Sequence, residues 1–181
     1  SVSKRADFGT SLEDGPFKDT GLAKAYRMAK TAQQGSVVMV DFESYVPAYG
    51  AQALFMATPI YIEGSMEGVI VIQIPNDEIN RVMTSEKQWS NVGLGASGET
   101  YIVGNDGTLR SETRSMIENK QSYLESLTTR KTDKKVISQI ENFDSGIGLH
   151  HIDTESANAA STGEEGQRII DGYNNESVVS S

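Results

Sequence analysis

Apolar positions in the first half of the chain switch from helical to strand spacing. The stripe that predicts a helix, from Gly21 to about Gln33, is made of Leu22, Ala25, Tyr26 and Ala29. Apolar, largely β-branched runs follow and predict strands at Val37–Phe42, Ala53–Ile62 and Gly68–Ile74. Because the first and third runs are almost continuously apolar, we expect both faces of these strands to be covered. A short helix is expected after Pro75, with Asn76 as its N-cap.

The pattern restarts after a glycine-rich connector between Trp89 and Gly98. Short strands are predicted at Thr100–Val103 and Thr108–Ser111, on either side of an Asn-Asp-Gly turn at 105–107. Two β-patterned halves are therefore separated by a connector, and this connector is the expected domain boundary.

Helical signals occupy the middle of the second half. Ser115 with Glu118 has the spacing of a capping box, which predicts a helix over about 115–128. Asp133 is placed to begin another helix. Residues 144–167 are rich in Gly, Ser, Thr and Glu and predict a loop.

The chain closes on a predicted hairpin, Arg168–Gly172 and Ser177 onward, with its turn at Asn174-Asn175. The last strand stops with its ladder incomplete, and the opening Ser1-Val2-Ser3 has no start methionine. We therefore expect an excised part of a longer protein.

Each half combines β-hairpins with helices on one side, which predicts an α+β fold rather than a βαβ alternation. We expect two modules, residues 1–90 and residues 91–181. The length of 181 residues suits one large domain or two small ones.

Composition then excludes several classes of protein. The absence of cysteine rules out disulfides and thiolate metal sites. A net charge of −9 argues against nucleic acid and against an anionic membrane surface as partners. No apolar run approaches the roughly 20 residues that span a bilayer.

The sequence contains a G-x-G-x-x-G motif at Gly93–Gly98. A dinucleotide site needs a strand before this motif and a helix after it. Here the predicted order is the reverse, so we interpret the motif as a flexible turn between the halves.

His150, His151 and Asp153 are the remaining candidates for a metal or a catalytic triad. Adjacent histidines point apart, and these are the two histidines of the chain. No G-x-S-x-G elbow accompanies them. We expect a structural or solvated role, with no metal, no cofactor and no catalytic residue.

The most promising chemistry lies at the end of the first predicted strand. Asp41 and Glu43, at i and i+2, are expected on one strand face next to Tyr45. Carboxylates ringed by aromatic side chains suit an amine or a polar solute, and a glycosidase pair is an alternative. A solvated strand end is the simpler interpretation. The aromatic residues that either line the same pocket or belong to the core are Tyr26, Phe55 and Tyr61.

Several segments resemble double Cache sensor domains. The most specific is the run from Gly93 to Ser111, of the form G-L-G-x-x-G-E-T-Y-x-V-G-x-D-G-x-x-R-S, which resembles the start of the membrane-proximal module. The segments similar to the distal module are 7–12, 15–17, 40–47, 57–61 and 68–73, and residues 168–181 resemble the proximal module's later hairpin.

The resemblance implies two PAS-like modules, each an antiparallel sheet with helices and loops on one face. It also implies a periplasmic ligand-sensing region of an inner-membrane bacterial receptor. The usual ligand pocket of such domains lies in the distal module. Against this family, the chain lacks the long N-terminal helix and the last strands.

The leading functional hypothesis is a non-enzymatic sensor that binds a small solute in the distal module and signals across the membrane. A methyl-accepting chemotaxis protein, anchored as a homodimer, is the first expectation for the parent. A histidine kinase or a nucleotide cyclase is the alternative. Two other classes stay open: a hydrolase using Asp41 and Glu43, and a dimerisation module whose partner is a second subunit or a periplasmic binding protein.

Overall fold

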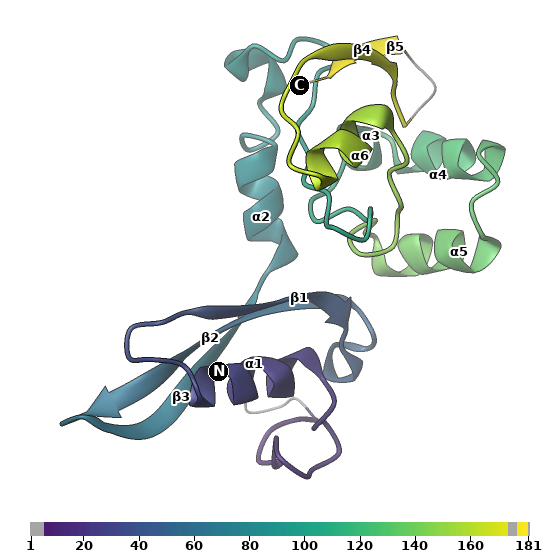
Figure 1. Cartoon of the computed structure of the whole chain (residues 1–181). Coiled ribbons are helices and arrows are strands. Elements are labelled where there is room, and N and C mark those ends of the chain that lie inside the picture. The colour runs from purple at the N-terminus through teal and green to yellow at the C-terminus, as the bar shows by residue number, and fades with distance from the viewer. Residues whose placement is uncertain (1–5, 174–176, 181) are drawn as a thin grey trace. The chain divides into compact units, whose positions relative to one another are not determined.

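The structure is a computed structural model that describes residues 6–173 and 177–180. It is an α+β protein with antiparallel sheets, and it divides into two compact units, residues 1–78 and 79–181 (Figure 1). The division falls inside helix α2 (Asn76–Met83), ahead of the glycine-rich connector. The assignment of residues 1–90 and 91–181 to two sensor modules stays a prediction.

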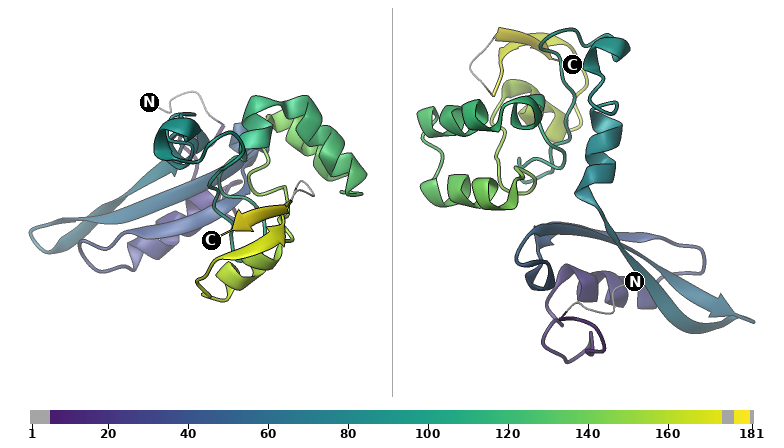
Figure 2. Two further views of the ribbon diagram at one scale, coloured as in Figure 1. Left: turned by 90° about the horizontal axis from the view of Figure 1, so that it is seen from above. Right: turned by 180° about the vertical axis from the view of Figure 1, so that it is seen from behind.

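Unit 1 is a three-stranded antiparallel sheet, in the order β1-β2-β3, with one helix on one of its faces (Figures 1 and 2). Its elements are α1 (Gly21–Lys30), β1 (Val38–Ser44), the 3₁₀ turn η1 (Val46–Ala48), β2 (Gln52–Ile62) and β3 (Ser65–Ile74). The helix and the three strands predicted from the hydrophobic pattern are all present.

Small residues bring α1 close to the sheet. Ala25 and Ala29 have no exposed surface and pack with Phe55 and Ala57 of β2. Alanine fits this position because a larger side chain would hold the helix away from the strands. Around Phe55 the sheet face is therefore sealed by helix backbone and methyl groups.

No described helix of unit 1 packs on the opposite face of the sheet. Several apolar side chains of this face are exposed, among them Met39, Ile60, Ile62, Ile70 and Ile72, whereas Leu54 is 8% exposed. The expectation that both faces of β1 and β3 are covered was wrong for this part of the chain. An apolar run on a strand indicates what its residues can pack against, but it does not supply the second layer.

Unit 2 is built mainly from short helices and well-bonded loops. After α2 its elements are η2 (Trp89–Val92), α3 (Arg114–Glu118), α4 (Lys120–Thr129), α5 (Lys134–Phe143), α6 (Glu155–Ser161), β4 (Arg168–Asp171) and β5 (Ser177–Ser180). The strands β4 and β5 pair antiparallel, as predicted. The predicted turn at Asn174-Asn175 lies outside the described residues. None of the helices in the described ranges is long and apolar enough to span a bilayer.

The helix predicted over 115–128 is in fact two helices, α3 and α4. Thr113, and not Ser115, is the N-cap of α3, since its hydroxyl accepts the Met116 amide. Asn119 interrupts the helix with an extended φ of −152° and caps α4 by accepting the Ser122 amide. Asn and Thr side chains compete with the helical backbone for hydrogen bonds, which is why they end one helix and begin the next.

Two further expectations for unit 2 need correction. Residues 155–161, predicted as loop, form α6, because the Thr154 hydroxyl caps the Ala157 amide. The segments around Asp106-Gly107 are not regular strands and share one isolated bridge, between Val103 and Leu109. Side-chain hydrogen bonds replace the ladder in this region.

The packing of unit 1 predicts which apolar side chains carry stability. Phe55→Ala is expected to lower the free energy of unfolding by about 3–5 kcal/mol, because it empties a site that is 2% exposed. Met39→Ala, on the uncovered face, removes a side chain that is 58% exposed and is expected to cost less than about 1 kcal/mol. Urea unfolding followed by circular dichroism compares the two. Equal costs would contradict the one-sided core.

Candidate ligand-binding site

Tyr45, at the end of β1, joins the loop that carries Asp7 to the core of unit 1. The Tyr45 side chain is buried, and its hydroxyl donates a hydrogen bond to Oδ2 of Asp7. Its ring lies edge-on to Phe55, with 5.0 Å between the ring centroids. Asp7 Oδ1 is also buried and accepts no hydrogen bond from the described residues. A carboxylate oxygen that has left water without a donor is stabilised by any group that brings one.

Glu43 adds a second carboxylate from the same strand. One of its oxygens lies 2.5 Å from the ammonium group of Lys24 on α1. A Cβ on Gly21 would come within 3.1 Å of both Glu43 Oε1 and Phe55 Cδ2, so the first turn of α1 can approach the sheet because residue 21 is glycine. We call Asp7, Lys24, Glu43, Tyr45 and Phe55 the Tyr45 cluster.

Helix α1 also holds the loop that carries Asp7. The Arg27 guanidinium donates to the carbonyls of Leu12 and Lys18, and Lys30 forms an ion pair with Glu13 at 2.7 Å. Exposed ion pairs contribute little energy, but the two carbonyl contacts of Arg27 fix the course of the chain. Helix α1 therefore positions both carboxylates, Glu43 through Lys24 and Asp7 through the loop.

Asp41 does not share a face with Glu43, and that expectation was wrong. The β1–β2 register pairs Val40 with Phe55 and Glu43 with Ala53, so a bulge places Asp41 and Phe42 together opposite Leu54. Glu43 faces α1, whereas Asp41 is exposed on the other side of the sheet and accepts the Phe42 amide. Two carboxylates on opposite faces cannot flank one glycosidic bond, so the geometry contradicts the acid–base pair.

Tyr26 and Tyr61 lie away from the Tyr45 cluster. The Tyr61 hydroxyl donates to the Ala32 carbonyl, and the Tyr26 ring lies 5.8 Å from the Lys30 ammonium. These contacts are at the C-terminal end of α1, whereas Glu43 and Phe55 meet its beginning. Of the six residues proposed from the sequence, the structure brings together Glu43, Tyr45 and Phe55.

Two members of the cluster, Asp7 and Lys24, were absent from the proposed site. Asp7 lies in a polar, turn-rich segment and is 38 residues away from Tyr45 in sequence. Lys24 occupies the polar side of an amphipathic helix, where a lysine is ordinary. The position of Asp7 within the first segment that resembles a Cache module was the available signal.

The G-x-G-x-x-G segment in unit 2 is a fixed turn. Arg114 Nη1 donates to the carbonyls of Gly95 and Gly98, both at 3.0 Å, and its guanidinium lies 4.6 Å from the centre of the Trp89 ring. A Cβ on Gly98 would overlap the Leu94 carbonyl oxygen. The motif thus presents its carbonyl oxygens, and not its amides, to the positively charged Arg114 side chain. This arrangement is the opposite of a phosphate cradle.

Residues 102–111, which follow the motif, form hydrogen bonds mainly with one another. Arg110, which is 8% exposed, donates to Asp106 Oδ1 at 3.0 Å and to the Thr108 carbonyl at 3.0 Å. The Ser111 hydroxyl accepts the Ile102 amide. A Cβ on Gly104 would overlap the Arg110 guanidinium. These residues stabilise a tight irregular loop, which accounts for much of the run from Gly93 to Ser111 without a ligand.

Unit 2 also buries a group of titratable side chains. Tyr173 donates to Glu99 Oε1 at 2.5 Å, and burial raises the pKa of the Glu99 carboxyl against the effect of that bond. Burial likewise raises the pKa of Glu112, whose oxygens accept from the Ser145 hydroxyl and the Gly146 amide. His150 is buried, and its neighbour His151 is exposed. The two histidines therefore point apart, as expected.

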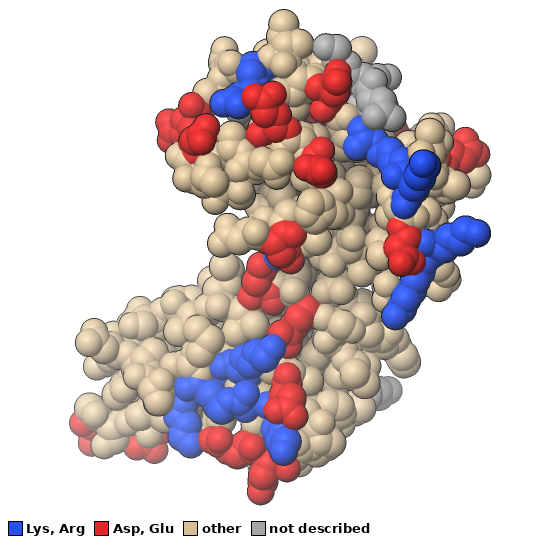
Figure 3. Space-filling view, turned by 45° about the vertical axis from the view of Figure 1, so that its right-hand side comes forward, with Lys and Arg blue, Asp and Glu red and all other residues tan. Residues whose placement is uncertain are grey.

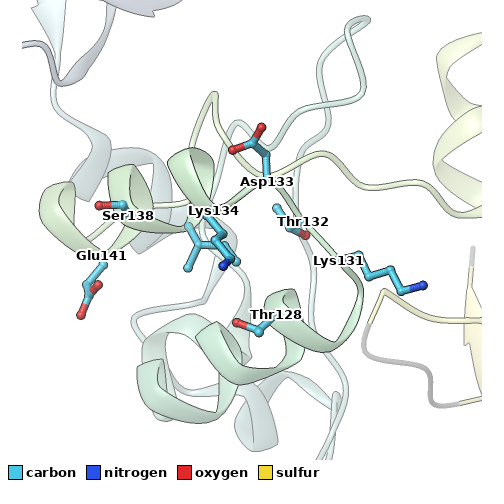
Figure 4. Close-up of a pocket in the computed structure, with 8 residues that line it drawn as sticks. Thr128, Lys131, Thr132, Asp133, Lys134, Ser138 and Glu141 are labelled. Carbon is cyan, nitrogen blue, oxygen red and sulfur yellow. The ribbon is translucent and has the colours of Figure 1, made fainter.

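A hollow of about 770 Å³ lies between α4 and α5 (Figure 4). The residues that line it are Thr128, Lys131, Thr132, Asp133, Lys134, Ile137, Ser138 and Glu141. In Figure 4 Lys131, Asp133 and Glu141 point in different directions, and Lys134 is directed toward Thr128. A binding site needs polar groups that converge on one ligand, and these diverge.

Charge on the visible surface is mixed. Figure 3 shows Lys and Arg side chains interspersed with Asp and Glu side chains, without one large area of a single sign. The net charge of −9 is thus not concentrated on this face. This face therefore does not indicate recognition of a partner through a broad area of one charge. Local groups such as the Tyr45 cluster are the better candidates for a binding site.

Comparison with known proteins gives a structural likeness to a chemoreceptor domain. No family model matches the chain, and no curated protein matches it. Among solved structures, the ligand-binding domain of the Pseudomonas fluorescens chemoreceptor CtaA, in complex with L-serine, matches with a TM-score of 0.40 and 15% sequence identity. The match covers 62% of this chain and 40% of that chain, so less than half of the chemoreceptor chain has a counterpart here.

The fixed turn at Gly93–Gly98 predicts that a substitution of Gly98 destabilises unit 2. Gly98→Ala is expected to lower the free energy of unfolding of unit 2 by about 1–3 kcal/mol, since the new methyl group must displace the Leu94 carbonyl. Gly166→Ala is the matched control, because a Cβ there meets no atom within 4 Å. Trp89, the single tryptophan, reports the unfolding of this unit by fluorescence. A Gly98 variant as stable as the control would contradict a fixed turn.

Proposed function

We propose that the chain is the ligand-sensing region of a bacterial transmembrane receptor, and that a small solute binds at the Tyr45 cluster. The observation that carries this proposal is a pair of contacts at the buried Tyr45–Phe55 rings. Tyr45 binds Asp7, and Glu43, which binds Lys24, lies with Phe55 against the first turn of α1. The resemblance of Gly93–Ser111 to double Cache domains supports the sensor class. In that class the domain lies outside the cytoplasm, and a chemotaxis receptor is the first candidate for the parent.

The chemistry of the cluster favours a cationic ligand. Asp7 offers a buried oxygen without a donor from the described residues, and Glu43 offers a carboxylate that is partly exposed. An ammonium group forms charge-assisted hydrogen bonds with a carboxylate, and the neighbouring aromatic rings add a cation–π contribution. Lys24 is the competing cation that such a ligand displaces from Glu43.

Ligand binding at the Tyr45 cluster is coupled to the position of helix α1. Asp7 belongs to the loop that Arg27 and Lys30 tie to α1, and Glu43 is tied to the first turn of the same helix. A ligand that takes over Glu43 releases Lys24 and changes what holds α1 against the sheet. A difference in affinity of a few kcal/mol between two helix positions is sufficient to shift their populations.

Thermal unfolding of the full chain tests the proposal with amines, amino acids, organic acids, sugars and nucleobases, each compound assayed for chemical change afterwards. A bound compound at 100 times its Kd stabilises by about 2.7 kcal/mol, which raises Tm by several degrees. We expect a cationic compound to raise Tm and to be recovered intact. A compound that is consumed would contradict the sensor and indicate an enzyme. No shift, with a mass that rises with concentration, would contradict it in favour of a dimerisation module.

Substitution of Glu43 tests the site within this function. Glu43→Gln keeps the shape of the side chain and removes its charge, so affinity for the cationic compound is expected to fall at least about tenfold, or 1.4 kcal/mol. Glu67→Gln, an exposed position on β3, is the matched control and leaves affinity unchanged. Titration calorimetry measures both. Equal affinities would place the ligand elsewhere and leave the sensor class standing.

A further inference from the structure

His150 joins three separate segments of unit 2. Its side chain is 3% exposed, and Nδ1 shares a hydrogen bond of 2.6 Å with the Tyr123 hydroxyl of α4. The imidazole lies edge-on to two rings, with centroid distances of 5.4 Å to Tyr123 and 5.9 Å to Tyr173. One side chain therefore links the 146–152 loop to α4 and to Tyr173, two residues beyond β4.

The backbone around His150 forms hydrogen bonds with the backbone of residues 107–109. The Leu109 amide donates to the His150 carbonyl at 3.0 Å, and the Gly148 amide donates back to the Leu109 carbonyl at 2.8 Å. The Ile152 amide donates to the Gly107 carbonyl at 2.8 Å. These hydrogen bonds are few and local, so they open as one group if the side chain between them is displaced.

Burial favours the neutral form of the imidazole. Burial also raises the pKa of the Tyr123 hydroxyl, which therefore keeps its proton and shares a hydrogen bond with Nδ1 of the neutral ring. Either neutral tautomer satisfies this bond, because a hydroxyl donates to a bare Nδ1 or accepts from an Nδ1–H. A second ring proton places a positive charge in a site that is 3% exposed.

The surrounding charges do not compensate for that proton. Burial, with smaller contributions from Arg130 and His151, lowers the pKa of His150 to about 4. The nearby carboxylates have other donors: Glu112 accepts from Ser145 and Gly146, and Glu99 accepts from Tyr173 and the Arg114 amide. Glu112 and Tyr123 both crowd Gly146, at 3.4 Å and 2.8 Å from the place of a Cβ there.

We propose that His150 is an acid-operated latch, in which the charge of the protonated imidazole destabilises its buried packing against Tyr123 and Tyr173 and releases residues 146–152 from residues 107–109. The release is local: unit 1 contains no part of the latch and stays folded. This regulation does not depend on the ligand site at Tyr45.

The direction of the pH effect follows from proton binding. The closed latch binds a proton only near pH 4, whereas an opened imidazole binds one near its usual pKa of about 6.5. The closed form is therefore fully favoured above about pH 6.5 and is lost as the pH falls toward 4. Glu99 and Glu112, whose raised pKa values act in the opposite direction, are common to every variant compared.

Amide hydrogen exchange measured on the full chain at pH 7, 6 and 5 tests the latch. We expect the protection factors of Gly148 and Ile152 to fall by up to about tenfold per pH unit below 6.5, with those of the β2–β3 pair unchanged. In His150→Asn, whose amide oxygen still accepts from Tyr123 but does not titrate, this fall is expected to disappear. His151→Asn, at the exposed neighbour, is the matched control and keeps the fall.

Three results would overturn the proposal: the same pH dependence in His150→Asn as in the wild type, no pH dependence in the wild type, or equal loss of protection in the β2–β3 pair. If His150→Asn does not fold, the imidazole signals of the wild-type chain decide by nuclear magnetic resonance. The latch requires His150 to titrate below the usual imidazole pKa of about 6.5 while Gly148 and Ile152 lose protection. Titration of His150 near 6.5 with protected amides would contradict it.

Discussion

The burial of the Tyr45 ring, with its hydroxyl bound to Asp7, is the interaction on which the account of unit 1 depends. A buried hydroxyl without a partner costs free energy, and the Asp7 carboxylate supplies that partner where Tyr45 completes the Phe55 core. Asp7 comes from a loop held by Arg27 of α1. Packing of the core and placement of the Asp7 carboxylate therefore depend on the same helix.

Unit 2 uses buried polar residues in place of regular strands. Arg110, Glu112, Thr113 and His150 are each less than 9% exposed, and each has hydrogen-bond partners within the unit. Such networks specify one arrangement of irregular loops, because each partner that is lost leaves a buried polar group unsatisfied. The same property makes the unit sensitive to protonation at a few positions.

The sequence predicted the elements of unit 1 well, because hydrophobic period and turn residues determine them locally. It failed where long-range contacts decide. The bulge that separates Asp41 from Glu43 depends on the register with β2, and the pairing of Asp7 with Tyr45 joins a loop to a strand end. In unit 2, Asn119 divides a continuous helical pattern through a local side-chain bond that periodicity does not contain.

We propose above all that a small cationic solute binds at the Tyr45 cluster. Mapping of backbone amide chemical shifts during titration with the stabilising compound tests it most directly. The account predicts that the largest changes occur at residues 6–8, 21–25 and 43–46, with the hollow between α4 and α5 unaffected. Changes centred on residues 128–141, with none around Tyr45, would contradict the claim.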